Sequence, residues 1–147
     1  MDDNLRKSII LENYSNPVNK KTINDDNYYK VNMNSLSCID NLDFMVLIED
    51  DIIKDAYFDG QACAISTSAS SIMMKLIIGK SIEQVFEIIE NYENMINERE
   101  YDEKILQEAN VFNEIHKQAN RKKCALLPFE GLKKILLESR GSKKNEK

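Results

Sequence analysis

The 147-residue sequence has no tryptophan, one histidine, two prolines and four glycines. With 42% hydrophobic and 31% charged residues, this is the composition of an ordinary globular chain and not of a low-complexity one. No apolar run approaches the roughly 20 residues that a membrane-spanning helix needs. Residues 1–10 (MDDNLRKSII) lack the basic flank and the small-residue cleavage site of a secretory signal. We therefore expect a cytoplasmic protein that is neither secreted nor embedded in a membrane.

Basic residues are also fewer than acidic ones: the sequence has 20 Lys and Arg residues and 25 Asp and Glu residues, for a net charge of −5. Such an acidic chain has no overall field that favours nucleic acid, so we expect no nucleic-acid partner. The lysines near the end stand among Ser, Asn and Glu, which predicts a disordered basic tail over residues 141–147. The length before it, residues 1–140, fits a single domain.

The cysteine count is odd, because the sequence holds only Cys38, Cys63 and Cys124. An odd count excludes a fully paired disulfide framework, and the cytoplasm disfavours disulfides in any case. A cytoplasmic thiol is inert core, a redox group or a metal ligand. The count alone leaves these alternatives open.

Hydrophobic periodicity predicts strands first and helices afterwards. After a short helix over residues 4–11, an alternating pattern predicts a strand at 31–36, and a denser apolar run predicts a second at 42–49. A third strand is predicted at 52–58. Helical spacing follows at residues 64–78 and 82–96, and a last helix starts near Cys124, with Pro128 in its first turn. The acidic residues 49–51 predict a tight hairpin between the second and third strands. This order predicts an α+β fold, a three-stranded antiparallel sheet packed against several helices.

The three cysteines all fall where predicted elements end or begin. Cys38 ends the first strand, Cys63 begins a helix shortly after Gly60, and Cys124 begins the last helix. Asp40 follows Cys38 by two residues, so a sharp turn would aim both side chains at one point. Three thiolates and a carboxylate are a set that tetrahedral zinc accepts. On spacing alone, however, inert thiols and metal ligands both remain open, because the sequence has no CxxC pair.

Four stretches resemble the NifU/IscU-type iron–sulfur scaffold family, over nearly the whole chain. Residues 14–19 (YSNPVN) are similar to its Y-x-N-P-x-N segment, and residues 38–40 (CID) to its C-G-D motif. Residues 60–66 (GQACAIS) are similar to G-x-G-C-x-I-S, and residues 121–127 (RKKCALL) to R-x-K-C-A-x-L. Ile39 and Ala62 stand where the family motifs have glycine. Lys123 in place of a histidine, and an insertion at residues 97–120, resemble the SufU branch.

The resemblance implies a SufU/IscU-like fold and a zinc ion held by Cys38, Asp40, Cys63 and Cys124. It implies an iron–sulfur cluster assembly protein that takes persulfide sulfur from a SufS-type cysteine desulfurase, with Cys38 as the acceptor. The sulfur would then pass to iron–sulfur carrier or recipient proteins. The alternative is a scaffold on which the same thiols assemble a transient [2Fe–2S] cluster. Whether the chain is itself a sulfurtransferase enzyme stays open.

Arg121, three residues before Cys124, has two interpretations. It is either an ordinary surface charge or a cation that supports the thiolates or meets the partner. The sequence does not separate the two.

Overall fold

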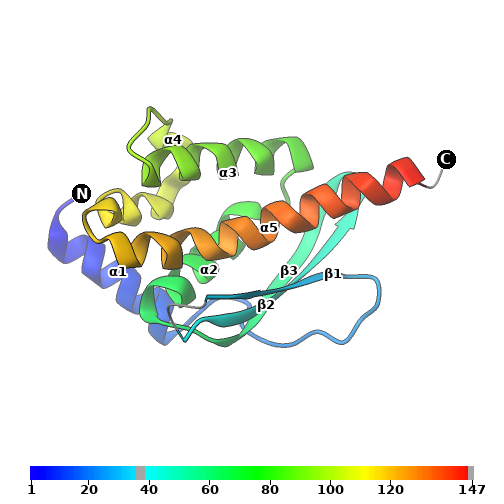
Figure 1. The fold of residues 1–147 in the computed structure, drawn as a ribbon, viewed down its shortest axis with the longest axis horizontal. Coiled ribbons are helices and arrows are strands. Elements are labelled where there is room, and N and C mark those ends of the chain that lie inside the picture. The colour runs from blue at the N-terminus through cyan, green and yellow to red at the C-terminus, as the bar shows by residue number, and fades with distance from the viewer. Residues whose placement is uncertain (36–38, 146–147) are drawn as a thin grey trace.

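The structure is a computed structural model that describes residues 1–35 and 39–145. Within these residues, three antiparallel strands form a sheet in the order β1-β2-β3, and helices follow them in the chain (Figure 1). The elements are α1 (Asp3–Ser15), β1 (Tyr29–Asn34), β2 (Asn41–Glu49), β3 (Ile52–Gln61), α2 (Ala64–Ile77), α3 (Ile82–Ile96), α4 (Glu103–Leu106), η1 (Gln107–Phe112), η2 (Ile115–Lys117) and α5 (Ala119–Asn145). The α+β prediction with its antiparallel meander is confirmed.

The β2–β3 hairpin closes as the acidic connection predicts. Glu49 pairs with Ile52, and the two residues between them, Asp50 and Asp51, have φ values of 54° and 61°. Two successive positive φ values are typical of a type I′ turn, whose twist matches that of the strands it joins. Aspartate tolerates this conformation better than most residues, which explains why the turn needs no glycine.

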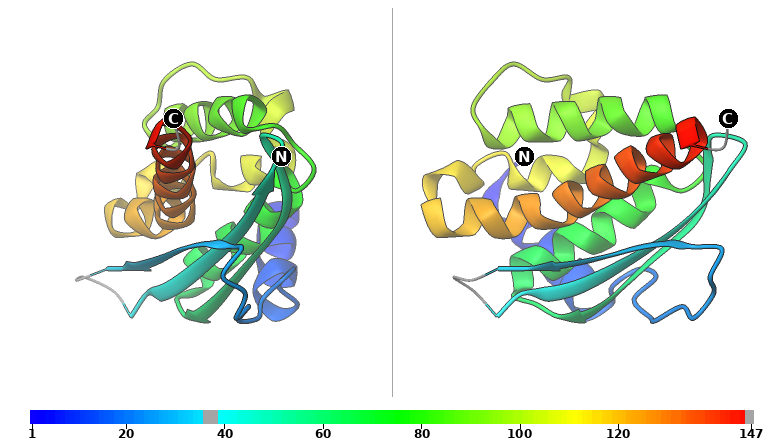
Figure 2. Two further views of the ribbon diagram at one scale, coloured as in Figure 1. Left: turned by 90° about the vertical axis from the view of Figure 1, so that its right-hand side faces the viewer. Right: turned by 45° about the vertical axis from the view of Figure 1, so that its right-hand side comes forward.

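The helices lie against one side of the sheet, and α5 runs lengthwise over it (Figures 1 and 2). Gly131 permits this close approach, because a Cβ there would lie 2.9 Å from Cγ of Met33 on β1. The ring of Phe44 on β2 lies beside the same position. Across the described residues, none of the helices is long and apolar enough to cross a membrane.

A buried polar chain fixes α1 and the segment after it against α2. The hydroxyl of Ser71 donates to Oδ1 of Asn13 (2.8 Å) and accepts from the backbone N–H of Val18 (2.9 Å). Asn13 is 2% exposed, so these bonds replace those that water would otherwise make. The turn at Pro17, where the sequence resembles the family segment, is thereby held beside α2.

The last helix differs from its prediction. α5 begins at Ala119, so Cys124 lies in its second turn and Pro128 lies inside the helix. Proline has no N–H for the carbonyl four residues earlier, which is that of Cys124. The hydroxyl of Ser66, 58 positions away in the chain, bonds to that carbonyl instead (3.0 Å), which explains how the helix continues past the proline.

Other boundaries differ less. β1 begins at Tyr29 and not at residue 31, and β3 extends to Gln61. The insertion at residues 97–120 folds mainly into α4 and the short 3-10 turns η1 and η2. α5 continues to Asn145. The division into a domain ending at residue 140 and a disordered tail stays a prediction.

A buried tyrosine stabilises α5 one residue beyond Cys124. Tyr92 donates from its hydroxyl to the carbonyl oxygen of Ala125 (2.8 Å), and its ring stacks on Phe129 at a centroid distance of 3.7 Å. Burial raises the pKa of Tyr92 well above its ordinary value, so the phenol stays protonated and donates at neutral pH.

We expect Tyr92→Phe to lower the free energy of unfolding by about 1–3 kcal/mol, because it removes a buried hydrogen bond without changing the ring. Denaturant titration followed by circular dichroism measures the change. Tyr14→Phe is the control, since Tyr14 is 48% exposed and the substitution removes a hydroxyl from a side chain that water can reach. A change below about 0.5 kcal/mol for Tyr92→Phe would contradict the expectation.

Candidate metal centre

Cys63 is the N-cap residue of α2, as the predicted helix start required. Its Sγ accepts from the backbone N–H of Ser66 (3.4 Å), and its side chain is half-buried. A thiolate at this position faces the positive end of the helix dipole. Gly60, the second-last residue of β3, has a φ of 126°, in a region that residues with a side chain rarely adopt.

Asp40 lies directly before β2 and is 2% exposed. Its Oδ1 accepts from the backbone N–H of Cys63 (2.8 Å), and its Oδ2 accepts from the hydroxyl of Ser66 (2.6 Å). A buried carboxylate is costly unless it is hydrogen-bonded, and these two bonds meet that need. Asp40 is therefore attached to the N-terminal turn of α2 by both of its oxygens.

Cys124 reaches the same place from α5. It is 2% exposed, and its Sγ lies 3.8 Å from the carbonyl oxygen of Asn120. The Ser66 hydroxyl contacts both the backbone of Cys124 and the carboxylate of Asp40, so one small side chain ties α2, α5 and the β2 start together.

Three candidate ligands thus converge from distant parts of the chain. One carboxylate oxygen of Asp40 and the Sγ atoms of Cys63 and Cys124 all lie within 4.8 Å of one another. Ligand atoms on a tetrahedral zinc lie about 3.8 Å apart at a Zn–S distance of about 2.3 Å. Small side-chain rotations would close that difference. The donor set, two soft sulfurs and one oxygen, therefore fits zinc and leaves one position for a fourth ligand.

The other two predicted site residues are Cys38 and Arg121. Cys38, predicted as the fourth ligand and the sulfur acceptor, lies outside the described residues. Arg121 is exposed in the first turn of α5, and its role in supporting the thiolates or a partner stays a prediction. Lys123, which precedes Cys124, is exposed as well.

Ser66 is the functional residue that sequence reasoning missed. It is fully buried and contacts three candidate ligands: the Asp40 carboxylate, the Cys63 sulfur (3.6 Å) and the Cys124 carbonyl. Its position three residues after an N-cap cysteine was the available signal, because that residue's N–H meets the cap. No local pattern indicates that its hydroxyl reaches residues 40 and 124.

A groove opens beside the half-buried Cys63. It is lined by Tyr14, Pro17, Lys20, Ile39, Gly60, Gln61, Ala62 and Thr67. Both positions that depart from the family glycines are among these, and Ile39 is 73% exposed. Ala62 is not among the described non-glycine residues with positive φ, so alanine fits there without backbone strain.

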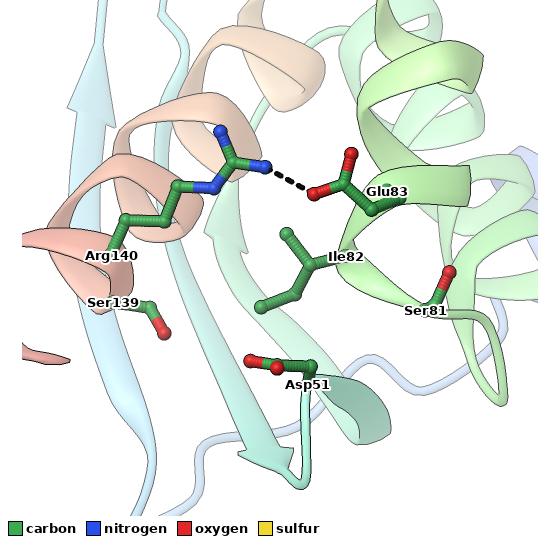
Figure 3. Close-up of a pocket in the computed structure, with 6 residues that line it drawn as sticks. All are labelled: Asp51, Ser81, Ile82, Glu83, Ser139 and Arg140. Atoms are coloured by element: carbon green, nitrogen blue, oxygen red, sulfur yellow. Dashed lines mark hydrogen bonds and ion pairs between the residues drawn. The ribbon is translucent and has the colours of Figure 1, made fainter.

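A second hollow lies between α5, the start of α3 and the turn that joins β2 to β3 (Figure 3). It is lined by Asp51, Ser81, Ile82, Glu83, Ser139 and Arg140. Within it, Arg140 pairs with Glu83 at 2.6 Å. Arg140 and Cys124 share α5, and at the helical rise they lie about 24 Å apart. Of these two hollows, only the groove is lined by residues that lead directly into Cys63 in the chain, Gly60, Gln61 and Ala62.

Comparison with known proteins agrees with this geometry. The family model of the NifU-like N terminal domain matches residues 5–125. The zinc-dependent sulfurtransferase SufU of Bacillus subtilis (strain 168) is 33% identical over 140 residues, which cover 95% of this chain and 94% of that protein. The iron–sulfur cluster assembly scaffold protein IscU of Thermotoga maritima is 34% identical over 102 residues, covering 69% of this chain and 72% of that protein.

Among solved structures, one from Fervidobacterium islandicum AW-1 is described as a candidate iron–sulfur cluster assembly scaffold protein for the SUF system. It superposes with a TM-score of 0.76 at 31% identity, over 92% of this chain and 99% of that one. The family match over residues 5–125 includes the whole sheet and all three candidate ligands in the described residues.

Proposed function

Because this chain belongs to the NifU-like N-terminal domain family, we propose that it is an iron–sulfur cluster assembly protein that binds zinc and accepts sulfur from a cysteine desulfurase. The proposed zinc ligands are Cys38, Asp40, Cys63 and Cys124. The observation that carries the proposal is the convergence of the Asp40, Cys63 and Cys124 ligand atoms within 4.8 Å. The SufU relative, which is named zinc-dependent, supports the choice of metal.

The protein's own residues prepare the proposed site in two ways. The N-terminus of α2 stabilises negative charge on the Cys63 sulfur. The Cys63 N–H and the Ser66 hydroxyl each donate a hydrogen bond to one oxygen of the Asp40 carboxylate and so hold it in place. Bound zinc would supply a divalent charge that keeps the coordinating thiols deprotonated at neutral pH. Three thiolates and a carboxylate exceed that charge by two, which leaves the thiolates electron-rich.

Sulfur transfer is proposed at Cys38, the cysteine nearest Asp40 in the chain. Its thiolate attacks the terminal sulfur of the persulfide on the desulfurase cysteine. A new S–S bond forms at Cys38, the old S–S bond breaks, and the desulfurase cysteine leaves as a thiolate. The terminal sulfur keeps its proton. Because one S–S bond replaces another, the step needs no external oxidant or reductant. The groove beside Cys63 provides a path for the partner's cysteine.

We further propose that the sulfur donor is a SufS-type desulfurase and that the recipients are iron–sulfur carrier proteins. The proposed location is the cytoplasm.

The second candidate function is a scaffold for a transient [2Fe–2S] cluster, which uses thiolate ligands too. Its support is the similarity to the IscU scaffold of Thermotoga maritima, at nearly the same identity as SufU. Lys123, in place of the histidine of IscU-type scaffolds, favours the sulfur acceptor.

The test is to measure zinc, iron and acid-labile sulfide in protein purified aerobically and, separately, anaerobically. The protein is then incubated with a SufS-type desulfurase and cysteine, and persulfides are alkylated and located by peptide mass spectrometry. We expect about one zinc per chain and a persulfide at Cys38 that Cys38→Ser abolishes. Brown protein with iron and sulfide would favour the scaffold instead. No metal in either preparation would contradict both candidates.

A further inference from the structure

Ser66 occupies a position that the proposed ligands alone do not explain. Its side chain is fully buried between α2, α5 and the start of β2. The Oγ atom lies 2.6 Å from Oδ2 of Asp40 and 3.0 Å from the carbonyl oxygen of Cys124. A hydroxyl carries a single proton, so these two acceptors compete for it.

The carboxylate is the stronger competitor. It is charged and closer, and charge-assisted hydrogen bonds are about twice as strong as neutral ones. The Cys124 carbonyl receives no N–H from four residues later in the helix, because that residue is Pro128. The main bond of Ser66 is therefore to Asp40, and the contact to Cys124 is secondary.

We propose that Ser66 is a positioning residue that holds the Asp40 carboxylate in the orientation needed for metal ligation. This inference rests on the proposed function, since it gives Ser66 a purpose at the same zinc site. The Cys63 N–H fixes Oδ1, and the Ser66 hydroxyl fixes Oδ2. With both oxygens held, rotation of the carboxylate is restrained, and each oxygen keeps a further lone pair for a metal ion.

Removing the Ser66 hydroxyl leaves Asp40 held at one oxygen. Asp40 is 2% exposed, so water cannot readily take the place of the lost donor. Contacts of this outer kind typically change metal affinity by about 10–100-fold. We expect Ser66→Ala to weaken zinc binding by a factor in that range, measured in competition with a chromophoric zinc chelator.

Ser70 provides a matched control. It lies one turn farther along α2, is also fully buried, and donates from its hydroxyl to the Ser66 carbonyl (2.8 Å). Ser70→Ala therefore removes the same group from the same helix without touching a candidate ligand. We expect it to change zinc affinity by less than about threefold, well below the effect of an outer-shell contact.

A double-mutant cycle separates positioning of Asp40 from a general structural role. If Ser66 acts through the carboxylate, Ser66→Ala has no further effect on zinc affinity in an Asp40→Ala background. If it acts through the Cys124 backbone, the loss persists there, since Asp40→Ala leaves that contact in place. Co²⁺ bound in place of zinc gives a second readout, because its visible ligand-field bands change when the carboxylate is displaced.

Each outcome decides the matter. Wild-type zinc binding with a Ser66→Ala loss that disappears in the Asp40→Ala background supports the inference. Wild-type binding with equal losses in both backgrounds, or with no loss, overturns the inference and leaves the proposed function standing. No zinc binding by the wild type overturns both. Should Ser66→Ala not fold, Ser66→Thr and Ser66→Val form the test pair, since they differ only in the hydroxyl.

Discussion

Replacing Cys124 by serine should lower zinc affinity by more than about 100-fold, beyond the range of outer-shell contacts. Cys124 is 2% exposed, and its Sγ lies within 4.8 Å of the Asp40 and Cys63 ligand atoms. A serine hydroxyl stays protonated at neutral pH and is a poor zinc ligand, so the variant loses a thiolate while keeping nearly the same volume. Chelator competition measures the affinity, and circular dichroism confirms the fold.

The control for this substitution is Asn120→Ala, one turn earlier on α5. The Asn120 side chain is exposed, so the variant changes the same helix without changing the ligand set. We expect its zinc affinity to match the wild type. If Cys124→Ser bound zinc as tightly as Asn120→Ala, Cys124 could not be a ligand, and the proposed site would be wrong.

Gly60→Ala should destabilise the protein by about 3 kcal/mol or more, the sum of a strained backbone and an overpacked contact. Gly60 has a φ of 126°, and an added Cβ would overlap the carbonyl oxygen of Asn41. Asn41 follows Asp40, and Gly60 precedes Cys63 by three residues. Relief of the overlap would shift both ligand-bearing segments, so zinc affinity should fall together with the unfolding free energy.

Gly79→Ala is the control that distinguishes the steric overlap with Asn41 from the strain of a positive φ. Gly79 also has a positive φ, of 88°, but an added Cβ there would meet nothing within 4 Å. We expect a loss of only about 1–2 kcal/mol in the unfolding free energy, from the left-handed backbone alone. Zinc affinity should be unchanged. Equal effects of the two substitutions on both quantities would contradict the role of the Asn41 contact.

Much of the fold was predictable because local pattern and tertiary structure agree. The apolar run of residues 42–49 and the stripe of residues 82–96 each match the element that forms, and Ser81 with Gln84 forms a capping box. The start of α5 was not predictable in this way. Local rules place Pro128 near a helix start. In the structure it lies inside α5, and the Ser66 hydroxyl donates to the Cys124 carbonyl in place of the N–H that proline lacks.

The candidate site was likewise predictable in part. Residue types and element ends singled out Cys63, Cys124 and Asp40, and the structure brings their ligand atoms together. The contacts that hold them could not be predicted, because they join α2 to segments 26 and 58 positions away. Pairings at such separations depend on how the elements pack. Periodicity along the chain does not specify them.

The proposed zinc site consists of thiolates and one carboxylate. Zinc K-edge X-ray absorption of the zinc-loaded protein reports which atoms bind the metal. We expect a four-coordinate shell of about three sulfurs at about 2.3 Å and one oxygen at about 2.0 Å. A shell of oxygen and nitrogen alone, without sulfur, would show that zinc binds elsewhere and that the proposed site is wrong.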